Sequence, residues 1–210
     1  MYSRYVARII SGFAGSLTIA VPASGTRPTS DRVREAVFSA LEARDAIEGC
    51  SVLDLYAGSG ALGLEAASRG AAYVVLVEKS PVAAKICRSN AALIQGKAPR
   101  GGGRGVSGRG VGTGAASGSP VRIEVASEAV QSFLDGDSAV WDLVFLDPPY
   151  ELGTAELETN LAALAPRLSP DATVVIERSS RDPEPTWPAG LTLDKRKLYG
   201  DTAIYWVSVA

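Results

Sequence analysis

The sequence predicts an α/β fold built on a mostly parallel, doubly wound sheet with helices on both faces. From Ser51 onwards, short apolar runs alternate with stretches in which apolar residues recur at helical spacing. This alternation is typical of parallel sheets, because each crossover between parallel strands needs a long connection that is usually a helix. A glycine-rich turn at Gly58–Gly63 joins the first of these strands to its helix, as in nucleotide-binding folds. The length of 210 residues fits one such domain.

The order of elements follows from apolar periodicity and from turn residues. Thr29 or Ser30 is expected to cap the first helix, because short hydroxyl side chains satisfy the free N–H groups of a helix start. The expected strands are 5–10, 17–21, 52–56, 73–77, 121–125, 143–146, 173–176, 191–195 and 202–209. The expected helices are one starting near residue 30, then 62–69, 81–94, 128–134 and 155–168.

The chain is expected to consist of a small appendage and a catalytic core. Residues 1–45 form the appendage, a hairpin and a helix, and residues 46–210 form the core. Within the core, residues 96–120 are rich in glycine and arginine and contain no acidic residue. Such a stretch buries too little apolar surface to offset its conformational entropy, so we expect a disordered loop.

Composition excludes several classes of function. The chain has no histidine, which removes mechanisms that use a histidine base and histidine metal sites. Its two cysteines, Cys50 and Cys87, lack metal-binding or disulfide spacing, so we expect no metal and reduced thiols in the cytoplasm. No apolar run is long enough to span a membrane. The net charge of −2 does not by itself indicate a nucleic-acid binder, and a monomer is expected.

The turn after the first core strand and the acid after the second predict a nucleoside ligand. Gly58, Gly60 and Gly63 permit a tight turn and close approach of a ligand to the backbone at a helix start. Glu78 lies about 20 residues further on, where an acid binds ribose hydroxyls in both dinucleotide and S-adenosylmethionine folds. The glycine pattern alone is weak, but the two features together favour a cofactor site.

Asp147-Pro148-Pro149-Tyr150, after an apolar strand, predicts chemistry on the amino group of a nucleobase. The lone pair of such an amine is delocalised into the ring. A carboxylate and a backbone carbonyl that both accept from the NH2 group draw the nitrogen toward tetrahedral geometry and free that lone pair. Tandem prolines restrict the backbone so that the carbonyl points outward. Tyr150 offers a face on which an extruded base stacks.

With these motifs the chain resembles the RsmD-type methyltransferases, which methylate the N2 amine of a guanine in 16S ribosomal RNA. The glycine turn and the Asp147–Tyr150 motif are shared with many amino-methyltransferases, whereas the segment Arg27–Glu35 is more specific. The segments that carry the resemblance are Arg8–Gly12, Gly25–Glu35, Asp54–Ala66, Glu78, Asp147–Tyr150 and Tyr199–Thr202.

The resemblance implies the class I methyltransferase fold, with seven strands of which the last is antiparallel. It also implies S-adenosylmethionine as cofactor and, as partner, 16S rRNA within the small ribosomal subunit or its assembly intermediate. The implied catalytic residues are Asp147, Pro148, Pro149 and Tyr150. The implied cofactor-binding residues are Thr29, Arg32, Asp54, Tyr56, Ala57, Gly58, Ser59, Gly60, Glu78, Lys79, Glu128 and Ala129.

Three segments depart from the family pattern. Relatives carry a basic stretch after Gly12, whereas this chain has the nearly uncharged Ala14–Leu17. Relatives often have Asp-Ala after the third core strand, where this chain has Glu128-Ala129. The glycine-arginine stretch at 96–120 is additional, and we hypothesise that it contacts RNA phosphates in place of the missing basic residues.

Four alternatives remain open from sequence alone. The pattern Gly58–Gly63 with Glu78 is compatible with a nicotinamide-dependent oxidoreductase, although that leaves Asp147–Tyr150 unexplained. The weakly charged hairpin is compatible with a non-catalytic RNA-binding assembly factor. An N6-adenine DNA or RNA methyltransferase would use the same Asp147–Tyr150 motif. A glutamine-modifying protein methyltransferase usually has asparagine at the position of Asp147.

Overall fold

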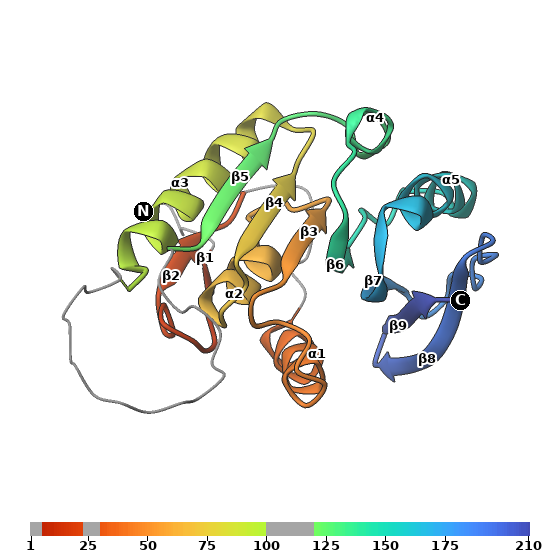
Figure 1. The fold of residues 1–210 in the computed structure, drawn as a ribbon, viewed down its shortest axis with the longest axis horizontal. Coiled ribbons are helices and arrows are strands. Elements are labelled where there is room, and N and C mark those ends of the chain that lie inside the picture. The colour runs from red at the N-terminus through yellow and green to blue at the C-terminus, as the bar shows by residue number, and fades with distance from the viewer. Residues whose placement is uncertain (1–5, 23–29, 100–119) are drawn as a thin grey trace, which may run out of the picture.

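A seven-stranded sheet forms the centre of the computed structural model, which describes residues 6–22, 30–99 and 120–210 (Figure 1). The strand order is β5-β4-β3-β6-β7-β9-β8. The first five are parallel, β9 runs antiparallel to β7, and β8 runs antiparallel to β9. The strands are β3 (Ser51–Leu55), β4 (Tyr73–Val77), β5 (Arg122–Ala126), β6 (Trp141–Leu146), β7 (Leu168–Ser179), β8 (Leu191–Tyr199) and β9 (Thr202–Val209). The predicted α/β class is confirmed.

Helices cover both faces of this sheet. One face carries α1 (Asp31–Glu42), α2 (Ala61–Ser68) and α3 (Pro81–Lys97), together with the small hairpin of β1 (Val6–Arg8) and β2 (Thr18–Ala20). The other carries α4 (Val130–Gly136) and α5 (Thr154–Leu164), which lie side by side (Figure 1). Successive residues of each central strand pack into apolar clusters on opposite faces of the sheet. Val52, for example, packs on the side of α1, α2 and α3, and Leu53 packs on the side of α4 and α5. Burial on both faces explains why these strands read as continuous apolar runs.

Several element boundaries differ from the sequence prediction. The predicted helix 155–168 is too long, since α5 ends at Leu164 and a 3-10 turn, Ala165–Arg167, follows it. Pro166 has no N–H to continue the helix, so Leu168 already begins β7. The predicted helix at 128–134 starts later, at Val130. Helix α3 runs through Gly96 and Lys97, the start of the predicted loop, and residues 100–119 of that loop lie outside the described residues.

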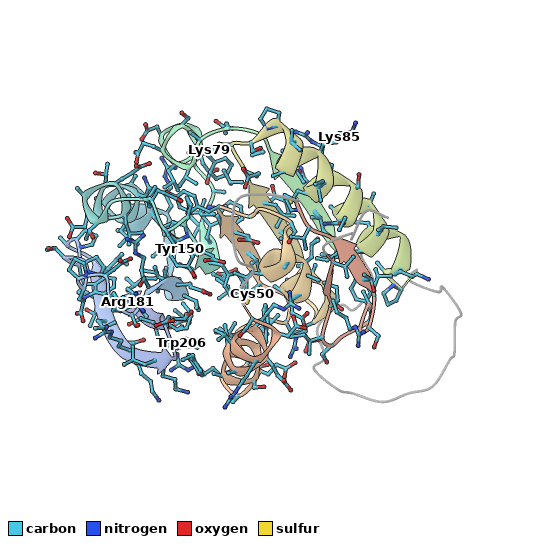
Figure 2. The ribbon with its side chains drawn as sticks, turned by 180° about the vertical axis from the view of Figure 1, so that it is seen from behind. Cys50, Lys79, Lys85, Tyr150, Arg181 and Trp206 are labelled. Atoms are coloured by element: carbon cyan, nitrogen blue, oxygen red, sulfur yellow. The ribbon has the colours of Figure 1, made fainter. Side chains whose placement is uncertain are left out.

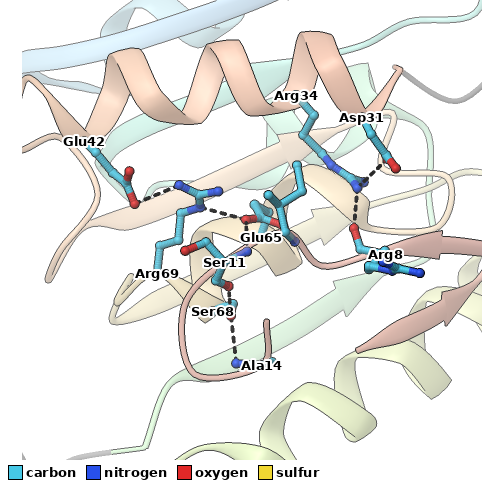
Figure 3. A network of polar contacts seen from close by, with 10 residues as sticks. Arg8, Ser11, Ala14, Asp31, Arg34, Glu42, Glu65, Ser68 and Arg69 are labelled. Atoms are coloured by element: carbon cyan, nitrogen blue, oxygen red, sulfur yellow. Dashed lines mark hydrogen bonds and ion pairs between the residues drawn. The ribbon is translucent and has the colours of Figure 1, made fainter. Parts of the chain in front are cut away.

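The N-terminal hairpin is held on α2 by buried polar contacts (Figure 3). The Glu65 carboxylate, fully buried, accepts the N–H groups of Ile10 at 2.6 Å and Ser11 at 3.0 Å. The Ser68 hydroxyl accepts the N–H of Ala14 at 2.9 Å. A Cβ atom at Gly12, whose φ is +80°, would lie 1.8 Å from the Ser68 carbonyl oxygen, so this approach requires glycine.

Helix α1 is tied to the hairpin through Arg34. Ser30 caps the helix by accepting the N–H of Val33 at 3.3 Å, so the predicted cap is present. The Arg34 guanidinium, 1% exposed, donates to the carbonyl oxygen of Arg8 and, at 2.8 Å, to the carboxylate of Asp31 (Figure 3). Burial lowers the pKa of Arg34, and the Asp31 charge opposes that shift. The buried charges of Arg34 and Glu65 therefore hold α1 and the hairpin on this face of the sheet.

Among residues 6–22, 30–99 and 120–210, no helix combines the length and the apolar character that crossing a membrane requires.

Candidate active site

A cavity of about 500 Å³ opens where the strand order reverses, between β3 and β6. Parallel sheets bind ligands at this switch point, outside the carboxyl ends of the strands. The volume lies within the range of small-molecule sites. Nine residues predicted from the sequence line it: Asp54, Tyr56, Ala57, Gly58, Ser59, Glu78, Lys79, Asp147 and Pro149. The tertiary structure therefore brings the glycine turn, the acid after β4 and the motif after β6 to one space.

The turn between β3 and α2 owes its shape to left-handed backbone. Tyr56 has φ of +65°, Gly58 +55° and Gly60 +79°. A side chain at Tyr56 in this region is uncommon, and such strained positions concentrate at functional sites. Gly63 serves a different purpose, since a Cβ there would lie 2.4 Å from the Leu76 side chain. The third glycine allows α2 to pack closely on β4.

Glu78 connects the glycine turn to the end of β4. Its Oε2 accepts the N–H of Gly58 at 2.9 Å, and its Oε1 accepts the N–H of Ser80 at 2.7 Å. Each carboxylate oxygen has a second lone pair, so both retain acceptor capacity for ligand hydroxyl groups. These bonds hold the carboxylate in one orientation beside the cavity.

Asp54 is a buried carboxyl beneath the same turn. It accepts the N–H of Gly63 at 2.9 Å and is 1% exposed. Burial raises the pKa of Asp54 to about 7, the Gly63 hydrogen bond acts in the opposite direction, and the charges of Asp147 and Glu78 raise it further. Because the folded pKa exceeds the unfolded value of 3.8, Asp54 contributes stability that is complete below the unfolded pKa and is lost as pH rises through about 7.

This linkage predicts how an Asp54→Asn variant responds to pH. Asparagine has a similar size, keeps an acceptor for Gly63 and does not ionise. The difference between a folded pKa of about 7 and an unfolded pKa of 3.8 corresponds to about 4 kcal/mol. We therefore expect the stability of the wild type relative to the variant to fall by about 4 kcal/mol between about pH 4 and pH 8. Urea unfolding across this range measures the difference, and parallel stability curves would contradict the raised pKa.

The motif after β6 separates this cavity from a second one. Asp147 and Pro149 line the first cavity, whereas Pro148 is buried. Tyr150, 59% exposed, lines a second cavity of about 290 Å³. Its other lining residues are Ser30, Val33, Glu177, Tyr199, Gly200, Asp201 and Thr202. Figure 2 shows Tyr150 well apart from Lys79, which lies on the first cavity. The first and last residues of the motif thus line two cavities of different size.

Several predicted cofactor residues lie away from the lining of the first cavity. Gly60 is buried behind the turn, and Arg32 is exposed on α1. Glu128 and Ala129 are exposed just before α4. Thr29 lies outside the described residues. Their assignment to cofactor binding stays a prediction from the resemblance.

The structure adds residues that were not named as site residues from the sequence, although the resemblance covers the segments that contain Arg34 and Tyr199. Arg34 lines the first cavity, and Glu177 and Tyr199 line the second. A signal for Arg34 was present, because it shares helical spacing with the buried residues Phe38 and Leu41, so a charge lies on the apolar face of α1. Glu177 had no comparable signal, since its place depends on how β7 pairs with its neighbours.

Comparisons with known proteins identify the family of this chain. The family model described as conserved hypothetical protein 95 matches residues 7–100 and 117–208. The chain is 34% identical over 198 residues to ribosomal RNA small subunit methyltransferase D of Escherichia coli K12, covering 93% of this chain and 86% of that protein. It is 31% identical to the protein of the same name from Haemophilus influenzae, covering 92% and 89%.

Solved structures show the same fold. A hypothetical protein of Thermus thermophilus superimposes with a TM-score of 0.74 at 29% identity, covering 97% of this chain and 100% of that one. The magnesium protoporphyrin IX methyltransferase of Synechocystis PCC 6803, solved with bound S-adenosylmethionine, gives 0.59 at 15% identity, covering 85% and 79%, which is a likeness of fold alone. The family model and the sequence relatives show that this chain belongs to the RsmD family of methyltransferases, and its sheet has the class I S-adenosylmethionine-dependent fold.

Proposed function

We propose that the protein transfers a methyl group from S-adenosylmethionine to the N2 amine of a guanine in 16S ribosomal RNA. One observation carries this proposal: Asp147 and Tyr150, the two ends of one short motif, line two different cavities, the first of them at the switch point of the sheet. The first space suits a methyl donor and the second an extruded base. The relatives named as ribosomal RNA methyltransferases, at 34% and 31% identity, support ribosomal RNA as substrate.

The residues of the first cavity fit S-adenosylmethionine. Its sulfonium and ammonium groups are cationic, and the carboxyl groups of Asp54, Glu78 and Asp147 surround the space. Glu78 keeps acceptor capacity for the two ribose hydroxyls. Apolar side chains, including those of Leu62 and Val82, offer surface for a flat adenine ring. When bound, the cofactor supplies an electrophilic methyl group on sulfur.

The chain's own residues position and activate the amine. Asp147 accepts a hydrogen bond from the NH2 group and so raises the electron density on its nitrogen. Attack of the nitrogen on the methyl group that bound S-adenosylmethionine would supply leaves the amine with one proton to release, and the Asp147 carboxylate would accept that proton. Tyr150 holds the base by stacking. Positioning therefore supplies a large share of the acceleration.

The edge strand β8 carries positive charge suited to RNA phosphates. Lys195 and Lys197 share one face of β8 with Tyr199, because alternate residues of a strand point the same way. In the described part of the chain neither lysine forms an ion pair. Arg44 adds a charge on this side, 4.9 Å from the centre of the Trp206 ring, and Trp206 lies opposite Lys195. This edge supplies basic residues that the N-terminal hairpin lacks and leads to the second cavity.

The proposed substrate is tested with particles that lack the modification. Small subunits and their assembly intermediates from cells without the gene are incubated with purified protein and S-adenosylmethionine. We expect mass spectrometry of the nuclease digest to show N2-methylguanosine at one position, and the reaction to proceed with monomeric enzyme. N6-methyladenosine instead would favour the adenine alternative, and binding without transfer would favour a non-catalytic assembly factor.

A further inference from the structure

Glu177 is half-buried and lines the second cavity, and methyl transfer as proposed above does not use it. We propose that Glu177 selects guanine by accepting the ring N1–H beside the amine that is methylated. This inference rests on the proposed function and adds a specificity-determining residue to it.

Strand register places Glu177 next to Asp147. In the parallel pair β6–β7, Leu146 lies opposite Ile176, so the following residues, Asp147 and Glu177, continue the same register at the carboxyl edge. Neighbouring strands are about 4.8 Å apart, a spacing that side chains can adjust to two adjacent hydrogen-bonding groups on a base edge. Asp147, on the first cavity, and Glu177, on the second, therefore lie at the ends of neighbouring strands.

The side chain of Glu177 turns toward α1. Ile176 belongs to the apolar cluster beside α4 and α5, and successive residues of a strand point to opposite faces. Ile204, the partner of Glu177 on β9, lies in the cluster beside α1. Ser30 and Val33, at the start of α1, line the same cavity as Glu177. The carboxylate thus faces the space that Tyr150 borders.

The other walls of the cavity suit a flat base. Tyr150 and Tyr199 bring two aromatic rings to it from different parts of the chain. Asp201 is a second carboxylate in the lining, but its side chain is 82% exposed. Glu177 is the more shielded of the two, so a hydrogen bond that it accepts is the stronger one.

Base chemistry makes a carboxylate at this position selective. Guanine carries a ring N–H next to its amine. Adenine and cytosine carry an unprotonated ring nitrogen next to theirs, so their neighbouring group is a lone pair. A carboxylate accepts from the guanine N1–H but repels a lone pair, because it has no proton to donate. With Asp147 accepting from the amine, Glu177 therefore favours the binding of guanine over that of adenine and cytosine.

The test uses 2-aminopurine, which keeps the amine of guanine and replaces the N1–H with a lone pair. Particles are reconstituted with RNA that has guanine or 2-aminopurine at the mapped target position, and kcat/KM is measured for each. We expect the wild type to prefer guanine by at least about 100-fold, because a site built to accept a hydrogen bond rejects an analogue that lacks the donor. Similar rates on the two bases would overturn the proposal without any variant.

The Glu177→Gln variant reverses part of that preference. Its amide can donate to a lone pair or accept from an N–H, so the preference for guanine should fall by about tenfold or more. Glu156→Gln, an exposed carboxylate at the start of α5, is the matched control and should keep the wild-type ratio. S-adenosylhomocysteine affinity, measured by calorimetry, should be unchanged in both variants.

The outcomes separate the two proposals. If the wild type methylates guanine and Glu177→Gln keeps the wild-type ratio, the role of Glu177 is wrong while the proposed function stands. If the wild type binds S-adenosylhomocysteine but methylates no guanine-bearing particle, the proposed function is contradicted, and the role of Glu177 with it.

Discussion

An Asp147→Ala variant is expected to lose methyl transfer by about 10²–10³-fold or more while it still binds S-adenosylhomocysteine. The carboxylate follows β6 on the wall of the first cavity, and in the proposed mechanism it accepts a hydrogen bond from the target amine. Removal of one preorganised group that stabilises charge in a transition state costs about this much in kcat. The loss should appear in kcat with little change in KM, because the hydrogen bond strengthens as the amine becomes tetrahedral.

Two further variants sharpen this prediction. Asp147→Asn keeps the shape and a carbonyl acceptor but loses the negative charge that accepts the released proton, so we expect turnover to fall less than in the alanine variant. Asp171→Ala removes an exposed carboxylate from β7 and should leave turnover unchanged. Single-turnover transfer of tritiated methyl groups and calorimetry with S-adenosylhomocysteine give the two measurements. Wild-type turnover by Asp147→Ala would exclude the proposed role of that carboxylate.

The second large effect is expected at Glu65, which contributes to stability and not to chemistry. Glu65→Ala should lower the free energy of unfolding by about 3–5 kcal/mol, as for other buried ion pairs that lose one partner. The fully buried carboxylate bonds to Arg69 at 2.7 Å and accepts two main-chain N–H groups, from Ile10 and Ser11. The variant leaves these donors and part of the Arg69 charge without an acceptor.

The control for Glu65 lies on the other side of the same arginine. Glu42 pairs with Arg69 at 2.7 Å, but its side chain is 50% exposed (Figure 3). Glu42→Ala should therefore cost no more than about 1 kcal/mol. Urea unfolding of both variants compares a buried and an exposed partner of one cation. Equal losses would show that the attachment of the hairpin does not depend on the buried carboxylate.

The position of the hairpin also matters for the cavity. Val21 and Pro22, which follow β2, line the first cavity, and the side-chain amide of Asn90 holds β2 through the Ala20 backbone at 2.9 and 3.0 Å. Loosening the hairpin through Glu65→Ala should therefore weaken cofactor binding as well as stability.

Local patterns were sufficient to predict the fold class and much of the first cavity. The helical and strand periods of apolar residues, the glycines at 58–63 and the acid at Glu78 are short-range features, and parallel strands place their ends together. The same reasoning placed Asp147 at a strand end. The lengths of β7 and β8 were underestimated, because their more exposed ends carry no continuous apolar pattern. Pairing of Leu168 with Trp141 of β6 extends the start of β7, and pairing with β9 extends the carboxyl ends of both strands.

The sequence by itself determined the order of strands and helices along the chain. It also determined that Asp54, Glu78 and Asp147 lie near the carboxyl ends of strands, because these features depend on residues close to one another in the chain. The tertiary structure alone decided the two cavities, of which Asp147 lines the first and Tyr150 the second. Arg34 reaches one of them, and Glu177 the other, through helix packing and strand register between segments far apart in the chain. Such contacts arise from burial of shared apolar faces, which no local pattern specifies.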